Sequence, residues 1–256
     1  MIPNTPWMIE AYELSKRYGE TLAVDSLDLQ VRAGEIFGFL GPNGAGKTTT
    51  IKMLVGLLRP SGGKALIGGH DIQQQPLPAK ALIGYVPDTP FLYEKLTGLE
   101  FLRFVGRLYN LESAQAGRRA QELLEMFELS ERATDLVQGY SHGMRQKLAL
   151  AAALIHQPRI FFLDEPTVGL DPKSARQVKD LLRQLAGQGT CIFMSTHILE
   201  IAERMCDRVG IIDHGHLLAC GTIEELRAAG GTGTLEDIFL QVTGGAEVEE
   251  MARHLE

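Results

Sequence analysis

The sequence has few cysteines, no long apolar run and no surplus of basic charge. Its three cysteines among 256 residues, Cys191, Cys206 and Cys220, lie far apart and form no C-x-x-C pair. This spacing argues against a disulfide framework and against a cysteine-based zinc site. We therefore expect three buried thiols in a protein of a reducing compartment.

Membrane-spanning and targeting segments are also missing from the sequence. The longest apolar stretches, LALAAALI and IFFL, fall far below the ~20 residues that a membrane-spanning helix needs. The stretch MIPNTPWMIEAYEL has no basic segment followed by an apolar one, so no signal peptide is expected. The net charge of −7 argues against nucleic acid as the main partner. The sequence predicts a cytoplasmic protein that does not itself cross a membrane and has no nucleic-acid partner.

Strand and helix patterns follow one another in a defined order. AYELSKRYG and LDLQVRAGE show the short alternation that is typical of antiparallel strands. EIFGFLG is almost wholly apolar, as a strand buried on both faces is, and a helix is expected from Lys47 to Leu58. Helical periodicity runs from Pro87 to about Pro158, and strands return in RIFFLDEP, CIFMSTH and VGIIDHG. This order predicts an α/β fold with a mostly parallel sheet core, an N-terminal antiparallel β subdomain and an inserted all-helical subdomain.

The helical stretch contains a clear start signal. Thr97 and Glu100 have the spacing of a capping box, in which each residue hydrogen-bonds the other's backbone N–H. Phe101, Val105 and Leu108 then follow at intervals that place them on one face of a helix. We expect this face to be packed against the rest of the protein.

The segment GPNGAGKT carries the most specific chemistry. It fits G-x-x-x-x-G-K-[ST] and lies between an apolar strand and a helix, which is the setting that this motif needs. Its glycines let successive backbone N–H groups point inward around phosphates, where a Cβ would obstruct them. Lys47 brings a positive charge to the β- and γ-phosphates, and the Thr48 hydroxyl can bind Mg²⁺. The pattern predicts a nucleoside triphosphate site made by Gly41, Pro42, Asn43, Gly44, Ala45, Gly46, Lys47, Thr48 and Thr49.

Two carboxylates and a histidine follow later strands. Asp164 and Glu165 end the apolar run IFFL, and the carboxyl ends of such strands are where α/β sheets bind ligands. Asp164 suits a Mg²⁺ ligand, and Glu165 suits the general base that polarises the attacking water. His197 follows the strand CIFMST at the same edge, from where it can reach the γ-phosphate. These residues predict hydrolysis of the bound triphosphate.

A serine precedes the most apolar helix of the chain. In YSHGMRQKLALAAALI, Ser141 has the position of an N-cap. A helix N-terminus is also a site for anions, because its backbone N–H groups and its dipole favour negative charge. Ser141 is therefore either a cap on a buried helix or part of a phosphate site.

Together, these motifs resemble those of the ATPase subunit of an ATP-binding cassette (ABC) transporter, over residues 8 to 245. GPNGAGKT matches the family's Walker A motif, IFFLDEP its Walker B motif with the catalytic glutamate, GLDP its D-loop and STH its switch histidine. YSHGMRQ stands at the signature motif, and IGYVPD stands at the Q-loop. The resemblance implies a P-loop NTPase (RecA-like) fold that hydrolyses ATP with Mg²⁺.

The resemblance also implies roles for residues that spacing alone does not assign. Tyr18 falls where the family stacks an aromatic ring on adenine, and Asp88 falls at the Q-loop position, near Mg²⁺. Two ATPase domains of this family pack head to tail around the nucleotides. Ser141 and the N–H of Gly143 would then face the γ-phosphate that the partner's Lys47 holds.

Two positions depart from the family pattern. His142-Gly143-Met144 replaces Gly-Gly-Gln in the signature, so we expect the backbone at His142 to tolerate a Cβ. Asp88 replaces the Q-loop glutamine and adds a negative charge beside other carboxylates, which can slow hydrolysis or change its coupling. Because Lys47, Asp164 and the other catalytic residues are present, we expect an active ATPase.

One branch of the family is most similar. YSHGMRQK, LYEKLTGLEFLRF and TLEDIFLQVTG resemble stand-alone ATPases that serve separate permeases exporting drugs, lipids, polysaccharides or antibiotics. The resemblance implies a homodimer or heterodimer of ATPase domains bound to integral-membrane permease subunits at the inner face of the cell membrane. It divides the chain into an ATPase domain (1–230, with a helical insertion at about 88–158) and a short helical tail (231–256). The segment after Asp88, including Tyr93, would form part of the groove for the permease's coupling helix.

Three alternatives remain. Soluble ABC ATPases of DNA repair, chromosome structure or translation carry long insertions for which this chain has no room. A switch GTPase would need an N-K-x-D motif, which is missing, and would leave His197 and the signature helix unexplained. An ATP-dependent regulatory dimer that closes without turnover is favoured only by Asp88.

Overall fold

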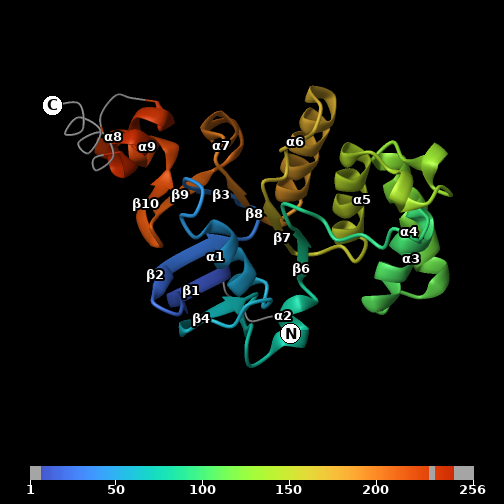
Figure 1. The fold of residues 1–256 in the computed structure, drawn as a ribbon, viewed down its shortest axis with the longest axis horizontal. Helices are drawn as coiled ribbons and strands as arrows, with labels where there is room; N and C mark the ends of the chain where they lie inside the picture. Colours follow the sequence, from blue (N-terminus) through green and yellow to red (C-terminus); the bar gives the residue numbers. More distant parts are fainter. Residues whose placement is uncertain (1–6, 231–233, 245–256) are drawn as a thin grey trace.

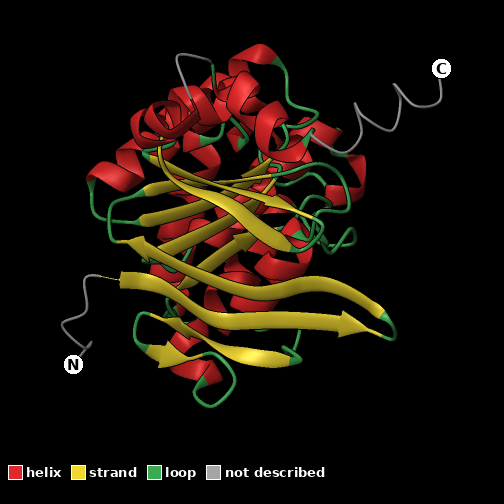
Figure 2. Ribbon diagram, turned by 90° about the vertical axis from the view of Figure 1, so that its left-hand side faces the viewer, coloured by secondary structure: helices red, strands yellow, loops and turns green. Residues whose placement is uncertain are grey.

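Two β-sheets form the centre of the molecule. The structure is a computed structural model that describes residues 7–230 and 234–244. One sheet has six strands in the order β10-β9-β3-β8-β7-β6, and the other has four in the order β2-β1-β4-β5. The sheets lie one above the other, and most of the helices gather beyond the six-stranded sheet (Figure 2). None of the helices in the described residues is long and apolar enough to cross a membrane.

The four-stranded sheet is antiparallel and holds the start of the chain. Its long hairpin pairs β1 (Trp7–Tyr18) with β2 (Thr21–Arg32), and β4 (Gly62–Ile67) and β5 (His70–Asp71) extend it. One face of the hairpin is buried, with Ile9, Leu14 and Val24 fully inaccessible to solvent. The expected N-terminal antiparallel region is confirmed, and its strands are longer than the sequence alternation indicated.

The six-stranded sheet is parallel except at one edge. Parallel pairs join β6 to β7, β7 to β8, β8 to β3 and β3 to β9, whereas β10 runs antiparallel to β9. These strands are β3 (Ile36–Leu40), β6 (Ile83–Val86), β7 (Ile160–Asp164), β8 (Cys191–Thr196), β9 (Arg208–Asp213) and β10 (His216–Thr222). Every residue of β3, β7 and β8 is buried. The predicted α/β fold with a mostly parallel core is confirmed.

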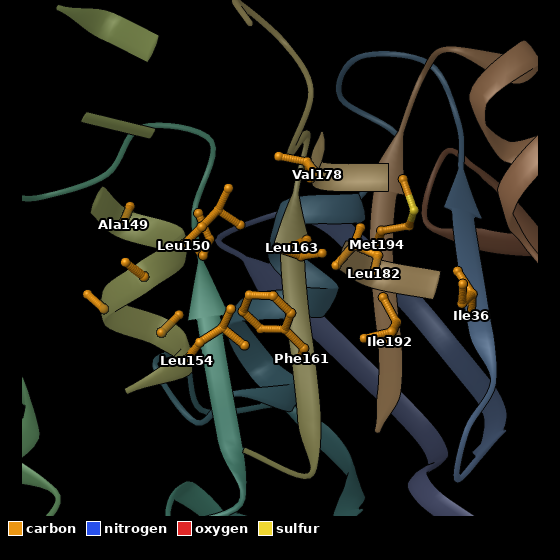
Figure 3. Close-up of a cluster of buried hydrophobic side chains, with 14 of the residues drawn as sticks. Ile36, Ala149, Leu150, Leu154, Phe161, Leu163, Val178, Leu182, Ile192 and Met194 are labelled. Carbon is orange, nitrogen blue, oxygen red and sulfur yellow. The ribbon is translucent and has the colours of Figure 1, made fainter. Parts of the chain in front are cut away.

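Alternate side chains of the central strands enter two different cores. Phe37, Phe162 and Phe193 point toward the antiparallel sheet, and the Phe37 and Phe193 rings stack with centroids 5.5 Å apart. Their neighbours in sequence, such as Phe161 and Leu163, enter the core on the helical side (Figure 3). A strand that is covered on both faces reads as a continuous apolar run, which is why these strands were predictable.

Most of the helices cover the other face of the parallel sheet or extend beyond its β6 edge, whereas Ile51, Leu54 and Ala79, from the helices that follow β3 and β5, belong to the core between the two sheets. α3, α4 and α5 lie together at one end, with α5 between the other two and strands β6 and β7 (Figure 1). The helices are α1 (Lys47–Leu54), α2 (Pro76–Lys80), α3 (Gly98–Leu108), α4 (Ser113–Met126), α5 (His142–Leu154), α6 (Pro172–Gly187), α7 (Leu199–Met205), α8 (Ile223–Gly230) and α9 (Leu235–Thr243). Short 3-10 turns at Ser130–Arg132 and Val137–Gly139 lead into α5.

The helix predictions are confirmed in part. The capping box of Thr97 and Glu100 is present at the start of α3. Leu108 is 65% exposed, so the expected apolar face of α3 is wrong at its last residue, where the helix ends. α1 ends at Leu54 rather than Leu58, because Gly56 takes a left-handed conformation with φ +68°.

The expectation of three buried thiols is confirmed for Cys191 and Cys206. It is wrong for Cys220, which is exposed on the edge strand β10.

The body of α5 is anchored in the helical-side core. Leu148, Leu150 and Leu154 are almost fully buried, and Figure 3 shows α5 side chains directed at β6 and β7. Burying a leucine stabilises the fold by roughly 1.5–3 kcal/mol, so a helix with several such residues is firmly held. This packing fixes the position of the N-terminal end of α5, where Ser141 lies.

A partly buried histidine just after α5 joins the end of this helix to the edge of the sheet. The His156 ring stacks on Tyr109 with centroids 3.6 Å apart, and its Nε2 lies 2.9 Å from the Ile83 carbonyl oxygen. Because a carbonyl only accepts hydrogen bonds, Nε2 carries the proton and donates. Burial lowers the pKa of His156 to about 4, so the ring is neutral at pH 7.

The lowered pKa of His156 predicts that the folded protein loses stability in mild acid. The folded-state pKa lies below the unfolded value, so the stabilisation is complete above about pH 6.5 and is lost as the pH falls toward 4. After allowance for solvent screening of the partly exposed ring, the loss is roughly 1–2 kcal/mol, or ~2–6 °C in Tm. Thermal unfolding is measured at pH 7 and at pH 5, and the drop in Tm between the two pH values is expected to be smaller for His156→Gln than for the wild type. The exposed-site control His214→Gln keeps His156, so a drop for His156→Gln as large as that of the control would contradict the assignment.

Candidate functional site

The loop between β3 and α1 is shaped to expose backbone N–H groups. Gly44 and Gly46 adopt positive φ angles of 83° and 109°, which L side chains rarely adopt. A Cβ on Gly46 would also lie 2.5 Å from the Ala23 carbonyl oxygen, and one on Gly41 would lie 2.2 Å from the Ile212 carbonyl oxygen. Glycine is therefore required by backbone conformation at Gly44, by packing at Gly41 and by both at Gly46.

Lys47 is folded back onto this loop. The residue is only 7% exposed, and its Nζ donates to the carbonyl oxygens of Gly41 at 2.7 Å and Pro42 at 3.0 Å. Burial lowers the pKa of the Lys47 amine, while the nearby carboxylates of Glu165 and Asp164 oppose this shift. The amine therefore lies in the space in front of the loop, close to both acidic residues.

Asp164 is held at the end of β7 by two hydroxyl groups. Thr48 Oγ1 donates to Asp164 Oδ2 at 2.8 Å, and Ser195 Oγ donates to Oδ1. Ser195 lies opposite Asp164 in the parallel pairing of β7 and β8, so the sheet itself sets this contact. Ser195 was not among the predicted site residues. Its signal in the sequence was a serine directly before Thr-His at a strand end.

Glu165 lies beside His197 with one oxygen unengaged. Its Oε1 is 2.8 Å from His197 Nδ1. Its Oε2 is buried without a hydrogen-bond partner in the described part of the chain. The Glu165 backbone has a positive φ of 52°, and its N–H donates to the Ser195 carbonyl at 3.2 Å. This strained conformation turns the side chain at the end of the strand, which is a feature typical of functional sites.

Asp88 lies at the same edge of the sheet. In the parallel pairing of β6 and β7, Val86 is opposite Leu163, so Asp88 extends beyond the strand alongside Glu165. Burial raises the pKa of the Tyr85 phenol, and the charges of Asp164 and Asp88 raise it further. Asp88 is exposed, and it brings a negative charge to the side of the site that Asp164 occupies.

Tyr18 is at the tip of the β1–β2 hairpin that packs on the P-loop. Ala23 of this hairpin contacts Gly46, and the N–H of Gly215 donates to the Ala45 carbonyl nearby. The Tyr18 side chain is 49% exposed, with Lys16 Nζ 5.2 Å from its ring centroid. Its ring is available to stack on a flat ligand.

Ser141 caps α5, but it is not joined to the P-loop of its own chain. Its Oγ accepts a hydrogen bond from the Met144 N–H at 3.3 Å, so it is the N-cap that the sequence predicted. Within the described residues, no hydrogen bond or ion pair links Ser141 or Gly143 to residues 41–49. The capped end of α5 is thus outside the hydrogen-bond network of the nucleotide loop among the described residues.

The unusual His142 fits into the D-loop. It is the first residue of α5 and has no positive φ, so its backbone accommodates the Cβ as expected. A Cβ built on Gly169 would lie 2.5 Å from His142 Nε2, which shows that the ring packs directly against this glycine. The replacement of glycine by His142 is thus accompanied by a contact between the signature and the D-loop within one chain.

A glycine-rich loop after β3, a buried lysine and an Asp–Glu pair at the end of β7 define a P-loop nucleoside triphosphatase. A family model described as ABC transporter matches residues 24–168. The daunorubicin resistance ATP-binding protein of Streptomyces coeruleorubidus is 44% identical over 90% of this chain and 72% of its own length. The linearmycin resistance ATP-binding protein of Bacillus subtilis is 40% identical over 93% of this chain and 76% of its own length.

Solved structures agree with this result. An ATP-binding subunit of an ABC transporter has a TM-score of 0.87 at 34% identity, covering 92% of this chain and 99% of that one. A dimeric ATP-binding cassette in a post-hydrolysis state, bound to ADP and Pi, has a TM-score of 0.78 at 25% identity over 84% and 98% of the two chains. The chain belongs to the ABC transporter family and carries its ATP-binding domain.

Proposed function

We propose that this chain is the ATPase subunit of an exporter whose permease is a separate membrane protein. The observation that carries this proposal is the arrangement of Thr48, Asp164, Glu165 and His197 in front of the Lys47 loop. Relatives named for daunorubicin resistance, linearmycin resistance and Nod factor export support an organic compound as cargo. The same comparisons disfavour a soluble, non-transport ABC ATPase and a dimer that only regulates.

ATP would bind between the hairpin tip and the P-loop. Adenine would stack on the exposed ring of Tyr18, which would exclude water from one face of the base. The backbone N–H groups of residues 41–49 would surround the phosphates. Lys47 would exchange its two carbonyl partners for the β- and γ-phosphate oxygens, whose negative charge offsets the cost of burying the amine.

The donor set at the end of β7 fits Mg²⁺. Mg²⁺ prefers oxygen ligands and usually takes one or two from the protein, with phosphates and waters completing the octahedron. Thr48 Oγ1 and Asp164 Oδ2 are 2.8 Å apart, so both oxygens can face one cation. Asp88, from the neighbouring strand end, would act through a water. When bound, the ion would neutralise charge on the β- and γ-phosphates.

Hydrolysis would use the free oxygen of Glu165. Oε2 is buried and has no partner within the described residues, so it is available to accept a proton from a water at the γ-phosphate. His197 would orient the Glu165 carboxylate through Oε1 and contact the γ-phosphate from its exposed side. Each residue would thus have one contact inside the protein and one toward the reacting groups.

The signature segment would complete the site of a second subunit. Ser141 and Gly143 lie at the N-terminal end of α5, whose body is buried, and within the described residues they are not hydrogen-bonded to the P-loop of their own chain. In a head-to-tail pair of ATPase domains, the Ser141 hydroxyl and the Gly143 N–H would bind the γ-phosphate held by the partner's Lys47. The pair would be a homodimer or would include another ATPase subunit.

An apolar groove between β6 and α3 would receive the permease. This groove has a volume of about 450 Å³ and is lined mainly by apolar residues that include Leu57, Pro90, Phe91, Tyr109 and Ala152. Phe91 is 97% exposed and Tyr93 is 59% exposed beside it, a cluster that favours contact with another protein. We place the chain at the cytoplasmic face of the membrane, with an ATPase domain at 1–230 that contains a helical insertion at about 88–158. The proposed tail at 231–256 is described only at 234–244, where α9 (Leu235–Thr243) lies, and its other residues lie outside the described part of the chain.

ATP-dependent dimerisation of the purified protein tests this proposal. Purified Glu165→Gln, which should hold ATP without hydrolysing it, is expected to double its mass in light scattering when Mg-ATP is added. Adding Ser141→Arg should abolish the dimer, because the larger side chain would occupy the γ-phosphate position of the other subunit. The control Ser113→Arg places an arginine on the exposed start of α4 and should leave the dimer intact. A dimer that tolerates Ser141→Arg would contradict the role of the signature, and a monomer under all conditions would contradict homodimerisation.

A further inference from the structure

The first turn of α5 contains a positively charged side chain, Arg145, which the helix dipole does not stabilise at this end. Arg145 is the fourth residue of the helix, and the turn contains no acidic residue. The partial positive charge at a helix N-terminus favours anions, so a guanidinium at this point needs acceptors from elsewhere. The partners of Arg145 show what it does there.

The Arg145 side chain is hydrogen-bonded to the backbone that leads into Ser141. Its Nε donates to the Tyr140 carbonyl at 3.2 Å, and its Nη2 donates to the Gln138 carbonyl at 3.1 Å. Its own backbone N–H donates to the Ser141 carbonyl at 2.9 Å. One residue therefore holds the backbone that leads into the capping serine, and its own N–H makes the first helical hydrogen bond to that serine.

The third arm of the guanidinium reaches a distant loop. Arg145 Nη1 lies 2.7 Å from Glu94 Oε1, and the two residues are 51 positions apart in sequence. The Gln138 N–H donates to the Glu94 carbonyl at 3.1 Å, and Lys95 Nζ donates to Gln138 Oε1 at 2.9 Å. The loop around Glu94 and the segment before Ser141 are thus connected by both backbone and side chains.

This loop is continuous with the rim of the apolar groove. Pro90, Phe91 and Leu92 line the groove, and Glu94 follows two residues later. A partner that presses on these groove residues would also move Glu94. In addition to the backbone hydrogen bond between Gln138 and Glu94, the Glu94–Arg145 ion pair joins this loop to the side chain that holds the segment before Ser141.

We propose that Arg145 is a positioning residue that keeps the Ser141 cap in register with the groove segment 90–96. The inference rests on the proposed function, because it makes Arg145 the link between permease contact and the γ-phosphate site of the other subunit. The ion pair itself is partly exposed, with 32% and 55% of the two side chains accessible, so it contributes little to stability. Its effect is on the placement of Ser141.

The test compares Arg145→Ala with two further variants. Arg145→Lys keeps the charge, but its three N–H donors share a single nitrogen, so it cannot reach the separated acceptors on Tyr140, Gln138 and Glu94 as the planar fork of a guanidinium does. Arg132→Ala removes a different ion pair, to Asp135, in the same helical region and is the matched control. Hydrogen exchange followed by mass spectrometry measures how firmly the Glu94 loop and the segment before Ser141 are held. Steady-state ATP hydrolysis measures whether the loss of this contact slows the reaction.

For Arg145→Ala we expect amide exchange in residues 92–98 and 136–146 to rise about fivefold or more, with exchange in β3 and β8 unchanged. The kcat for ATP should fall about tenfold, within the range of ordinary coupling energies, while binding of a fluorescent ATP analogue to the monomer stays within about twofold. Arg145→Lys should recover part of both effects, and Arg132→Ala should show neither.

Three results would overturn the inference. Unchanged exchange in residues 92–98 would show that Arg145 does not hold the groove loop. Faster exchange throughout the chain would show lost folding instead of lost positioning. Equal kcat in Arg145→Ala and the wild type would show that the link has no effect on the reaction. A wild-type protein without ATPase activity would contradict the proposed function instead, and the exchange data would still decide whether the link exists.

Discussion

Replacing Glu165 by glutamine is expected to reduce ATP hydrolysis by ~10²–10⁴-fold, because a general base of this kind contributes a factor of that size. The amide has almost the same shape as the carboxylate but cannot take a proton from water. The position is sharply defined in the structure, since Oε1 is paired with His197 and Oε2 is buried and unengaged among the described residues. Phosphate release at saturating Mg-ATP measures the effect.

Nucleotide binding provides the necessary comparison for this variant. Lys47 and the P-loop are untouched by the substitution, so the affinity for ATP should remain close to that of the wild type. Glu200→Gln is the matched control, because Glu200 is an exposed glutamate in the first turn of α7, three residues after His197. If Glu165→Gln hydrolysed ATP at the wild-type rate, the proton would have to go elsewhere, and the assignment of the base would be wrong.

Much of this architecture could be predicted from local patterns, because its central strands are covered on both faces. β3, β7 and β8 are short apolar runs, and each ends in or leads into residues of the site, such as Gly41, Asp164 and His197. The carboxyl ends of parallel strands meet at one edge, so the order of motifs along the chain was enough to bring them together.

The features that were not predicted depend on long-range contacts. β6 is a short edge strand of four residues, and β10 alternates between partly buried and exposed residues, so neither has a continuous apolar pattern. The hydrogen bond from Ser195 to Asp164 and the ion pair between Arg145 and Glu94 join residues far apart in sequence. A local pattern contains no information on such pairs. The sequence also could not show that His142 packs on Gly169.

Lys47→Ala is expected to weaken ATP binding by about 10–100-fold, since a hydrogen bond to a charged group is worth about 1.5–3 kcal/mol. Two effects combine at this position. The variant loses the charge that would face the β- and γ-phosphates, and it leaves the carbonyls of Gly41 and Pro42 without their buried donor. The loop would then be less well held even before nucleotide binds. Titration with a fluorescent ATP analogue measures the change.

The phosphate dependence of this loss separates the two effects. If Lys47 contacts the β- and γ-phosphates, the substitution should weaken ATP binding more than AMP binding, because AMP lacks both groups. An equal loss of affinity for both nucleotides would contradict a direct contact. Lys52→Ala on the exposed face of α1 is the matched control and should bind both nucleotides as the wild type does. Because burial lowers the pKa of the Lys47 amine, bound phosphate should raise it again, so ATP binding by the wild type should be accompanied by proton uptake at alkaline pH that Lys47→Ala lacks.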